Sequence, residues 1–192
     1  MDKKEVVEVY DEEAIDRAIE GMAMWCTQRK GEFLDEAWAA FEALCGDEVD
    51  FGGCEGIAQT VLNLAFTEWF IFDSKVFGHG CIDEYLSRAV GISDQSKAIL
   101  GELKGTARYG FFRYEGLFED GSGDKGIVVS DALDGHSFKV YSAYLHGLAI
   151  ERSFEPGTGL SARFAILGGR AYFVGQFPAH DKASADESET LN

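Results

Sequence analysis

Basic side chains are scarce in this chain. Its 192 residues include 17 lysines and arginines against 34 aspartates and glutamates, which gives a formal net charge of −17 at pH 7. Proteins that bind nucleic acid are usually basic on at least one face, because the phosphate backbone is negatively charged. We therefore expect no binding to duplex nucleic acid.

Long apolar runs and a secretion signal are also missing. No stretch approaches the ~20 consecutive apolar residues that a membrane-spanning helix needs. The N-terminal sequence MDKKEVVEVYDEE lacks the apolar segment and the small-residue cleavage site of a signal peptide. The sequence therefore predicts a cytoplasmic protein that makes no membrane contact.

Cysteine is rare and never closely paired. Cys26, Cys45, Cys54 and Cys81 are separated by 19, 9 and 27 residues, so none belongs to a Cys-x-x-Cys pair of the kind found in structural zinc sites. A chain with 46% hydrophobic residues can build its core without disulfides. We expect free or buried thiols, no metal ion and no cofactor; a disulfide and a metal or redox role stay open as alternatives.

What the chain does contain divides it into parts of different structural class. Residues 1–104 carry 22 acidic and 9 basic side chains and place their apolar residues at helical spacing. Residues 105–178 carry 8 acidic and 7 basic side chains and change to an alternating pattern rich in β-branched and aromatic residues. Residues 179–192 are polar and acidic, which predicts a disordered tail.

The sequence thus predicts an α+β protein with about five N-terminal helices and a small antiparallel β barrel or rolled sheet. The first two helices are expected to form an antiparallel hairpin across a short turn. The helices are predicted between Asp11 and Gly31 and over 34–45, 57–72, 82–90 and 93–104. The strands are predicted over 109–117, 127–133, 137–142, 148–153, 161–167 and 170–177, all pairing antiparallel.

The densest group of residues suited to catalysis starts near the end of the third predicted helix and comprises Glu68, Asp73, His79, Asp83 and Glu84. Glu68, Asp73, His79 and Asp83 combine carboxylates with an imidazole, which can hold a divalent metal or share a proton. One hypothesis is therefore a metal-dependent hydrolase built on these four side chains. Their spacing favours structural roles instead, because Glu68 and Asp73 are five residues apart and no HExxH or ExxH pair places two ligands on one helix face.

A glycine-rich segment between two predicted strands mimics two ligand-binding motifs. GSGDKG at 121–126 has the letters of a dinucleotide fingerprint, but a strand follows it where that motif needs a helix. The oxygen side chains from Asp120 to Asp131 are spaced like a calcium loop, yet Lys125 stands where the loop needs glycine. We interpret the segment as a hairpin connection.

Aromatic residues supply the remaining binding candidates, which are Trp69, Phe112 and Tyr114. With Phe111 and Phe118, the last two could form a stacking platform for single-stranded RNA, although core packing is the favoured interpretation in a nearly neutral region. Weak RNA binding would also need a basic patch drawn from Arg108, Arg113, Arg152, Arg163 and Arg170.

Four segments together carry a family resemblance: TEWFIFD (67–73), GHGCIDEYL (78–86), KGTARYGFFRYEGL (104–117) and VVSDALDGHSFKVYS (128–142). They resemble the domain that precedes the SEC-C motif in uncharacterised bacterial proteins. In those relatives the SEC-C tail binds zinc through closely spaced Cys and His and, in secretion proteins, recruits a chaperone. This chain has no cysteine after Cys81, so the resemblance implies neither property here.

The leading functional hypothesis is a non-enzymatic binding or adaptor module of the bacterial cytoplasm. The acidic helical part would meet a basic surface on a protein partner, because complementary charge favours such an encounter. The metal-dependent hydrolase and single-stranded RNA binding by the β part remain the alternatives.

Overall fold

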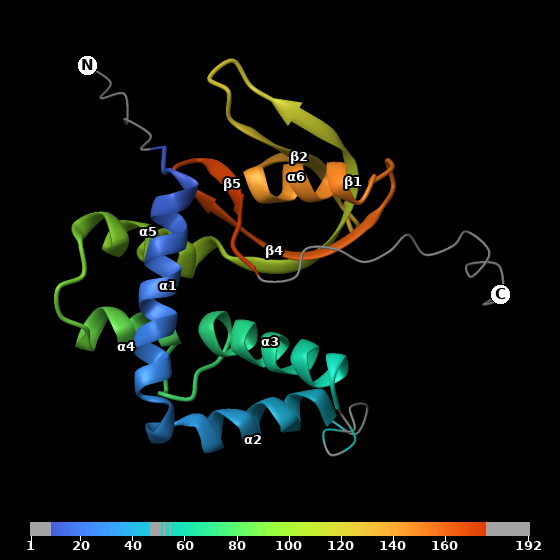
Figure 1. Ribbon diagram of the computed structural model, residues 1–192. Coiled ribbons are helices and arrows are strands. Elements are labelled where there is room, and N and C mark those ends of the chain that lie inside the picture. The colour runs from blue at the N-terminus through green and yellow to red at the C-terminus, as the bar shows by residue number, and fades with distance from the viewer. Residues whose placement is uncertain (1–8, 47–50, 52, 54, 176–192) are drawn as a thin grey trace. The chain divides into compact units, whose positions relative to one another are not determined.

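Two structural units are present in the computed structural model, which describes residues 9–46, 51, 53 and 55–175 (Figure 1). One unit spans Glu13–Lys104 and is helical. The other contains 105–175 together with 9–12 and is built around a β barrel. The predicted tail at 179–192 and Cys54 lie outside the described residues.

The helical unit contains the five helices that the sequence predicts, in the predicted order. Each buries a stripe of apolar residues, and in α1 that stripe includes Ile15, Ala18, Met22 and Cys26. The elements are α1 (Glu12–Gln28), η1 (Lys30–Glu32), α2 (Leu34–Cys45), α3 (Ile57–Phe72), α4 (Cys81–Arg88) and α5 (Asp94–Thr106). No helix among the described residues is long and apolar enough to cross a membrane.

The ends of these helices follow local sequence chemistry. The Ser93 hydroxyl accepts a hydrogen bond from the Ser96 amide at 3.0 Å, so Ser93 caps α5 as expected. Gly46 ends α2 with φ of 62°, a conformation that costs glycine little because it has no Cβ. The Asp73 amide bonds to the Trp69 carbonyl at the end of α3, in agreement with the predicted boundary.

The partner of α2 differs from the prediction. The sequence predicts an antiparallel hairpin of the first two helices, whereas α2 packs along α3 and leads away from the end of α1 (Figure 1). Aromatic rings join the two: Phe41 lies 5.5 Å from Phe66 and 5.3 Å from Trp69 between ring centroids. Ring packing between helices that are distant in sequence therefore decides the arrangement, which the short connection after α1 does not reveal.

The barrel is closed, with the strand order β1-β2-β3-β5-β4 and with β4 paired back to β1. The β3 and β5 pair is parallel, so the prediction of wholly antiparallel pairing is wrong. A closed ring with an odd number of strands cannot alternate in direction throughout, so one pair must be parallel. The strands are β1 (Arg108–Glu119), β2 (Lys125–Asp131), β3 (Ser137–Tyr141), β4 (Gly159–Leu167) and β5 (Arg170–Phe173).

A sixth helix replaces the strand predicted at 148–153. Helix α6 (Ala143–Glu151) begins where the Ser142 hydroxyl accepts a hydrogen bond from the Leu145 amide, as an N-cap does. Leu145 and Ala149, four residues apart, enter the core of the barrel. The strand prediction is wrong here because the helical spacing of this short segment becomes visible only once the barrel core that it packs against is known.

The interior of the barrel is apolar and tightly filled. Its most buried members, with no exposed surface, include Ile127, Val129 and Val140. A Cβ added at Gly126 would collide with the carbonyl oxygen of Val140 on β3, so this glycine permits the close approach of β2 and β3. Small Greek-key barrels of five strands, among them the OB-fold, serve unrelated functions, so the architecture alone assigns none.

Candidate functional site

A groove lies between α2 and α3 and has a volume of about 490 Å³. The buried ring of Phe66 and the half-buried indole of Trp38 supply its apolar surface, with centroids 4.7 Å apart. Exposed Asp35 and Glu42 place carboxylates beside these rings. The residues around the groove are Leu34, Asp35, Trp38, Ala39, Glu42, Asn63, Phe66 and Thr67.

The groove is shaped by contacts within and between its two helices. The Trp38 Nε1 donates a hydrogen bond of 2.7 Å to Glu42 Oε1 one turn along α2, which fixes the indole and one carboxylate together. The Thr67 hydroxyl donates to the Asn63 carbonyl within α3. The Trp38 ring and the Glu42 carboxylate are thus held in a defined geometry before any ligand arrives.

All the charge on the helices that form the groove is negative. Helix α2 carries Asp35, Glu36 and Glu42, helix α3 carries Glu68, and neither helix sequence includes Lys, Arg or His. Like charges in one region add to a common potential, which attracts ligands of opposite charge. The groove therefore favours a ligand that is both apolar and positively charged.

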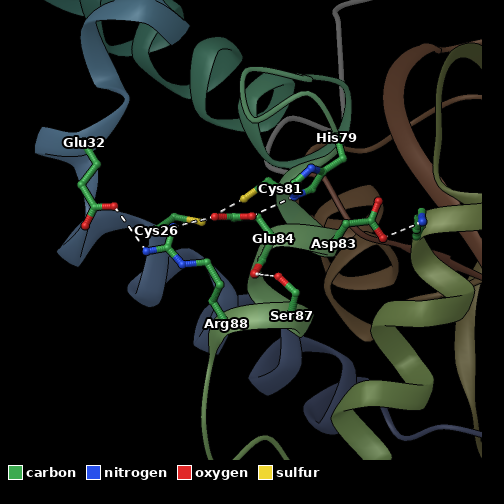
Figure 2. Close-up of polar contacts among 9 residues, drawn as sticks. Cys26, Glu32, His79, Cys81, Asp83, Glu84, Ser87 and Arg88 are labelled. Carbon is green, nitrogen blue, oxygen red and sulfur yellow. Dashed lines mark hydrogen bonds and ion pairs between the residues drawn. The ribbon is translucent and has the colours of Figure 1, made fainter.

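A second polar cluster surrounds Glu84 on α4 (Figure 2). The Glu84 side chain is only 10% exposed, and it accepts hydrogen bonds from His79 Nε2 at 2.8 Å and from Arg88 Nη1 at 2.6 Å. Arg88 also lies 3.7 Å from Glu32 on η1. The Arg88 hydrogen bond, reinforced by His79, lowers the pKa of Glu84 despite burial, which opposes that shift.

Two of the four side chains of the hydrolase hypothesis bond to residues outside that set. His79 bonds to Glu84, and Asp83 receives a hydrogen bond of 2.6 Å from Lys104 on α5 (Figure 2). Glu68 is buried within α3, and Asp73 is exposed at the end of that helix. Both side chains have interactions. Within the described ranges, no three His, Cys, Asp or Glu side chains are grouped so that they could hold a metal ion.

Of the four barrel aromatics singled out from the sequence, Phe112 and Tyr114 face inward, whereas Phe111 is 60% exposed. Phe112 and Tyr114 are buried in the barrel core, so neither ring is available for stacking with a ligand. The outer row instead contains Phe118 and Tyr141, which lie across Gly126 with ring centroids 5.0 Å apart. Trp69, the third aromatic candidate, is half-buried and packs against rings of α2 and α3.

Two of the five arginines named for RNA binding are buried or already paired. Arg163 is 3% exposed, and Arg170 is paired with Asp124 at 2.6 Å while its guanidinium stacks on Tyr141. Arg108, Arg113 and Arg152 are exposed. The two arginines closest to outer aromatic rings are thus already engaged, which weakens them as phosphate ligands.

The glycine-rich connection between β1 and β2 satisfies its own polar groups. Asp120 accepts hydrogen bonds from the amides of Ser122 and Asp124 and from the Ser122 hydroxyl. These hydrogen bonds, chiefly the one from the Ser122 hydroxyl, lower the pKa of Asp120. The segment is a hydrogen-bonded turn between strands, in agreement with the hairpin interpretation.

Comparisons with protein-family models, curated proteins and solved structures found no match to this chain. Function is therefore inferred from the side chains and surfaces of the molecule itself.

Two features of the helical unit were not found from the sequence. One is the groove. Its negative charge is visible in the sequence, because residues 31–74 contain no basic side chain, but its shape is not. The other is a contact between Cys26 and Cys81, whose sulfur atoms lie 2.9 Å apart although 55 residues separate them. No local pattern reveals a contact between residues so distant in sequence.

Proposed function

We propose that this chain is a non-enzymatic binding module whose α2/α3 groove holds a basic, apolar segment of a protein partner. The observation that carries the proposal is the combination of exposed carboxylates and aromatic rings on two helices that bear no basic side chain. Apolar side chains of the segment would cover Trp38 and Phe66. Its lysines or arginines would face Asp35 and Glu42.

The dimensions of the groove suit such a segment. A volume of about 490 Å³ falls within the roughly 300–1,000 Å³ typical of sites that take drug-sized ligands. That space accommodates a few side chains, not a folded domain. Helix-in-groove recognition of this kind uses apolar anchors at helical spacing, with charge around them to set orientation.

The setting of the module is part of the proposal. Free Cys26, Cys45 and Cys81 suit a reducing compartment, which supports a cytoplasmic location. The resemblance of 67–142 to the domain that precedes SEC-C motifs in bacterial proteins supports a bacterial source. Neither point identifies the partner, which is defined here only by the chemistry of its docking segment.

Binding of a synthetic probe tests the proposal. The probe is a fluorescent helical peptide of about 14 residues with leucines on one face and lysines elsewhere. Its control is the same peptide with glutamates in place of the lysines. Fluorescence anisotropy should show binding of the lysine peptide alone, and binding should weaken at about 1 M salt because exposed charges are then screened.

Matched variants separate the groove from general attraction to an acidic protein. Asp35→Asn with Glu42→Gln removes two charges beside the groove and should weaken binding roughly tenfold. Glu115→Gln with Glu151→Gln removes two exposed charges from the barrel unit and should leave binding unchanged. Equal loss in both double variants would overturn the groove as the binding site.

An apolar pair provides the second comparison. Leu34→Ala truncates a side chain beside the groove, whereas Leu44→Ala truncates a more exposed leucine of the same helix that does not line it. The first should weaken binding of the lysine peptide roughly fivefold and the second should not. Equal affinities for the two variants would show that apolar contacts in the groove do not contribute.

A further inference from the structure

Two buried cysteines meet in the helical unit. Cys26 lies in the last turn of α1, Cys81 is the first residue of α4, and the two residues are 5% and 1% exposed. Their Sγ atoms are 2.9 Å apart, with one thiol donating to the other sulfur, and both lie beside Glu84 and Arg88 (Figure 2). The pair thus joins two helices that are distant in sequence.

The surroundings of the pair distinguish the two thiols. The hydrogen bond from Cys81 lowers the pKa of Cys26, burial opposes this, and the positive charge of Arg29 adds to the lowering. That same hydrogen bond, followed by burial and the negative charge of Glu84, raises the pKa of Cys81. Cys26 is therefore the sulfur that more readily becomes a thiolate, and Cys81 keeps its proton.

We propose that Cys26 and Cys81 are a reversible oxidation site that forms an intramolecular disulfide when the protein meets a small peroxide. The Cys26 thiolate attacks one oxygen of hydrogen peroxide, the O–O bond breaks, and the departing hydroxide takes up a proton to become water. Cys26 is now a sulfenic acid. The Cys81 sulfur then attacks the Cys26 sulfur, the S–O bond breaks, and a second water leaves with the proton of Cys81.

The two steps balance as a two-electron exchange. Two thiols lose one electron each to form the S–S bond, and one peroxide is reduced to two molecules of water. A small dithiol such as dithiothreitol reverses the reaction by thiol–disulfide exchange. This oxidation goes beyond the proposed peptide binding and does not depend on it.

Geometry favours this pair over other thiols. A disulfide bond is about 2.0 Å long, so the two sulfurs need to approach by less than about 1 Å from their present contact. Cys45 is half-buried on α2, and burial raises its pKa, which leaves less thiolate to react. Because the pair is buried, a small peroxide should reach the sulfur atoms more readily than a bulky aromatic disulfide reagent.

The disulfide would close a chain segment of 55 residues that contains α2 and α3. Closing a long segment restricts the unfolded chain more than the folded one. The oxidised protein should therefore unfold about 5 °C higher than the reduced protein, and dithiothreitol should remove the difference.

Peptide mapping of the full chain tests the proposal in a single digest. Native protein is treated with hydrogen peroxide, free thiols are alkylated under denaturing conditions, and trypsin is added without reductant. Cleavage at lysine and arginine places Cys26 in 18–29, Cys81 in 76–88, and both Cys45 and Cys54 in 31–75. Mass spectrometry should find 18–29 linked to 76–88, with the loss of two hydrogens.

Variants set the controls. Cys45→Ser with Cys54→Ser leaves the pair intact and should give the same linked peptides and the same rise in unfolding temperature. Cys26→Ser should abolish both, while circular dichroism at room temperature verifies that the variant remains folded. Links that involve 31–75 in native protein, or alkylation of both Cys26 and Cys81 after peroxide treatment, would overturn the proposal.

Discussion

The helical unit and the barrel unit use similar side chains in opposite ways. In the barrel each strand pairs with two neighbours, and the aromatic rings of Phe112 and Phe164 pack inside a closed apolar core. In the helical unit Trp38 remains half-exposed beside a groove, and a buried carboxylate, Glu84, replaces apolar packing at α4. Closure thus gives each described strand two hydrogen-bonded neighbours, whereas the helical unit contains a groove and a buried carboxylate cluster.

Charge separates the two regions in the same way. Residues 1–104 carry a net charge of −13, while residues 105–178 carry −1. In the barrel, Arg170 pairs with Asp124 and Lys125 with Glu119, but α2 and α3 include no basic side chain to pair with their carboxylates. Under the proposed function, this charge difference places the binding surface on the helical unit.

The largest effect should come from breaking the barrel. Gly126→Ala places a methyl group against the Val140 carbonyl and should lower the free energy of unfolding by about 3 kcal/mol. Gly121→Ala is the matched control, because its added methyl group would meet open space and should change stability by less than about 0.5 kcal/mol. Urea unfolding followed by far-UV circular dichroism measures both, and equal stability of the two variants would contradict the close approach of β2 and β3.

A smaller, local effect is expected from the ionic cluster of the helical unit. Glu84→Gln removes the charge that His79 and Arg88 share and should cost about 1–3 kcal/mol. Hydrogen exchange should show faster exchange in α4 and unchanged protection in β2 and β4. Glu36→Gln, an exposed carboxyl of α2, serves as the control. Loss of protection throughout the barrel would show that the two units do not differ as described.

The next effect in size should be the loss of stability when acid protonates Glu84 in the ionic cluster of α4. The pKa of Glu84 is lowered in the folded state, chiefly by its hydrogen bond to Arg88, so its stabilising effect is complete above the ordinary value near 4.5. As the pH falls below that value and through the lowered pKa, the carboxyl is protonated and this stabilisation is lost. Thermal unfolding from pH 6 to 3 should show a smaller loss in Glu84→Gln than in the unchanged chain. Parallel curves for the two proteins would contradict the assignment.

The smallest effect is expected on the barrel surface. Arg170→Lys keeps the charge near Asp124 but loses the planar guanidinium that lies 4.3 Å from the Tyr141 ring centroid. The expected cost is about 0.5–1 kcal/mol in urea unfolding, and α4 should keep its rate of hydrogen exchange. A larger cost than that of Glu84→Gln would reverse the ranking of the two clusters.

Local features of this fold follow from sequence, and long-range ones do not. The predicted helix over 57–72 has the observed bounds of α3, and the Gly168–Gly169 turn between β4 and β5 was expected from its glycines, which both have positive φ. Periodicity and turn chemistry act over a few residues, so they are visible in one dimension. The parallel β3 and β5 pair depends on closure of the whole barrel and was missed.

The same division applies to the candidate sites. Glu68, Asp73, His79 and Asp83 were grouped because they are near in sequence, but His79 bonds to Glu84 and Asp83 bonds to Lys104. Nearness in sequence does not by itself group side chains: Glu68 lies on α3, Asp83 on α4, and the other two lie in the connection between these helices. The groove and the cysteine pair need elements far apart in sequence to meet, which a single sequence does not show.

The central claim is that the α2/α3 groove binds a basic, apolar segment, and photo-crosslinking locates binding most directly. A lysine–leucine peptide with one benzophenone side chain is irradiated with the full chain, and tryptic fragments are mapped by mass spectrometry. Crosslinks are expected in 31–75, the fragment that contains α2 and α3, and should be lost in the Asp35→Asn, Glu42→Gln variant. Crosslinks concentrated in barrel fragments from 109–175, unchanged in that variant, would contradict the claim.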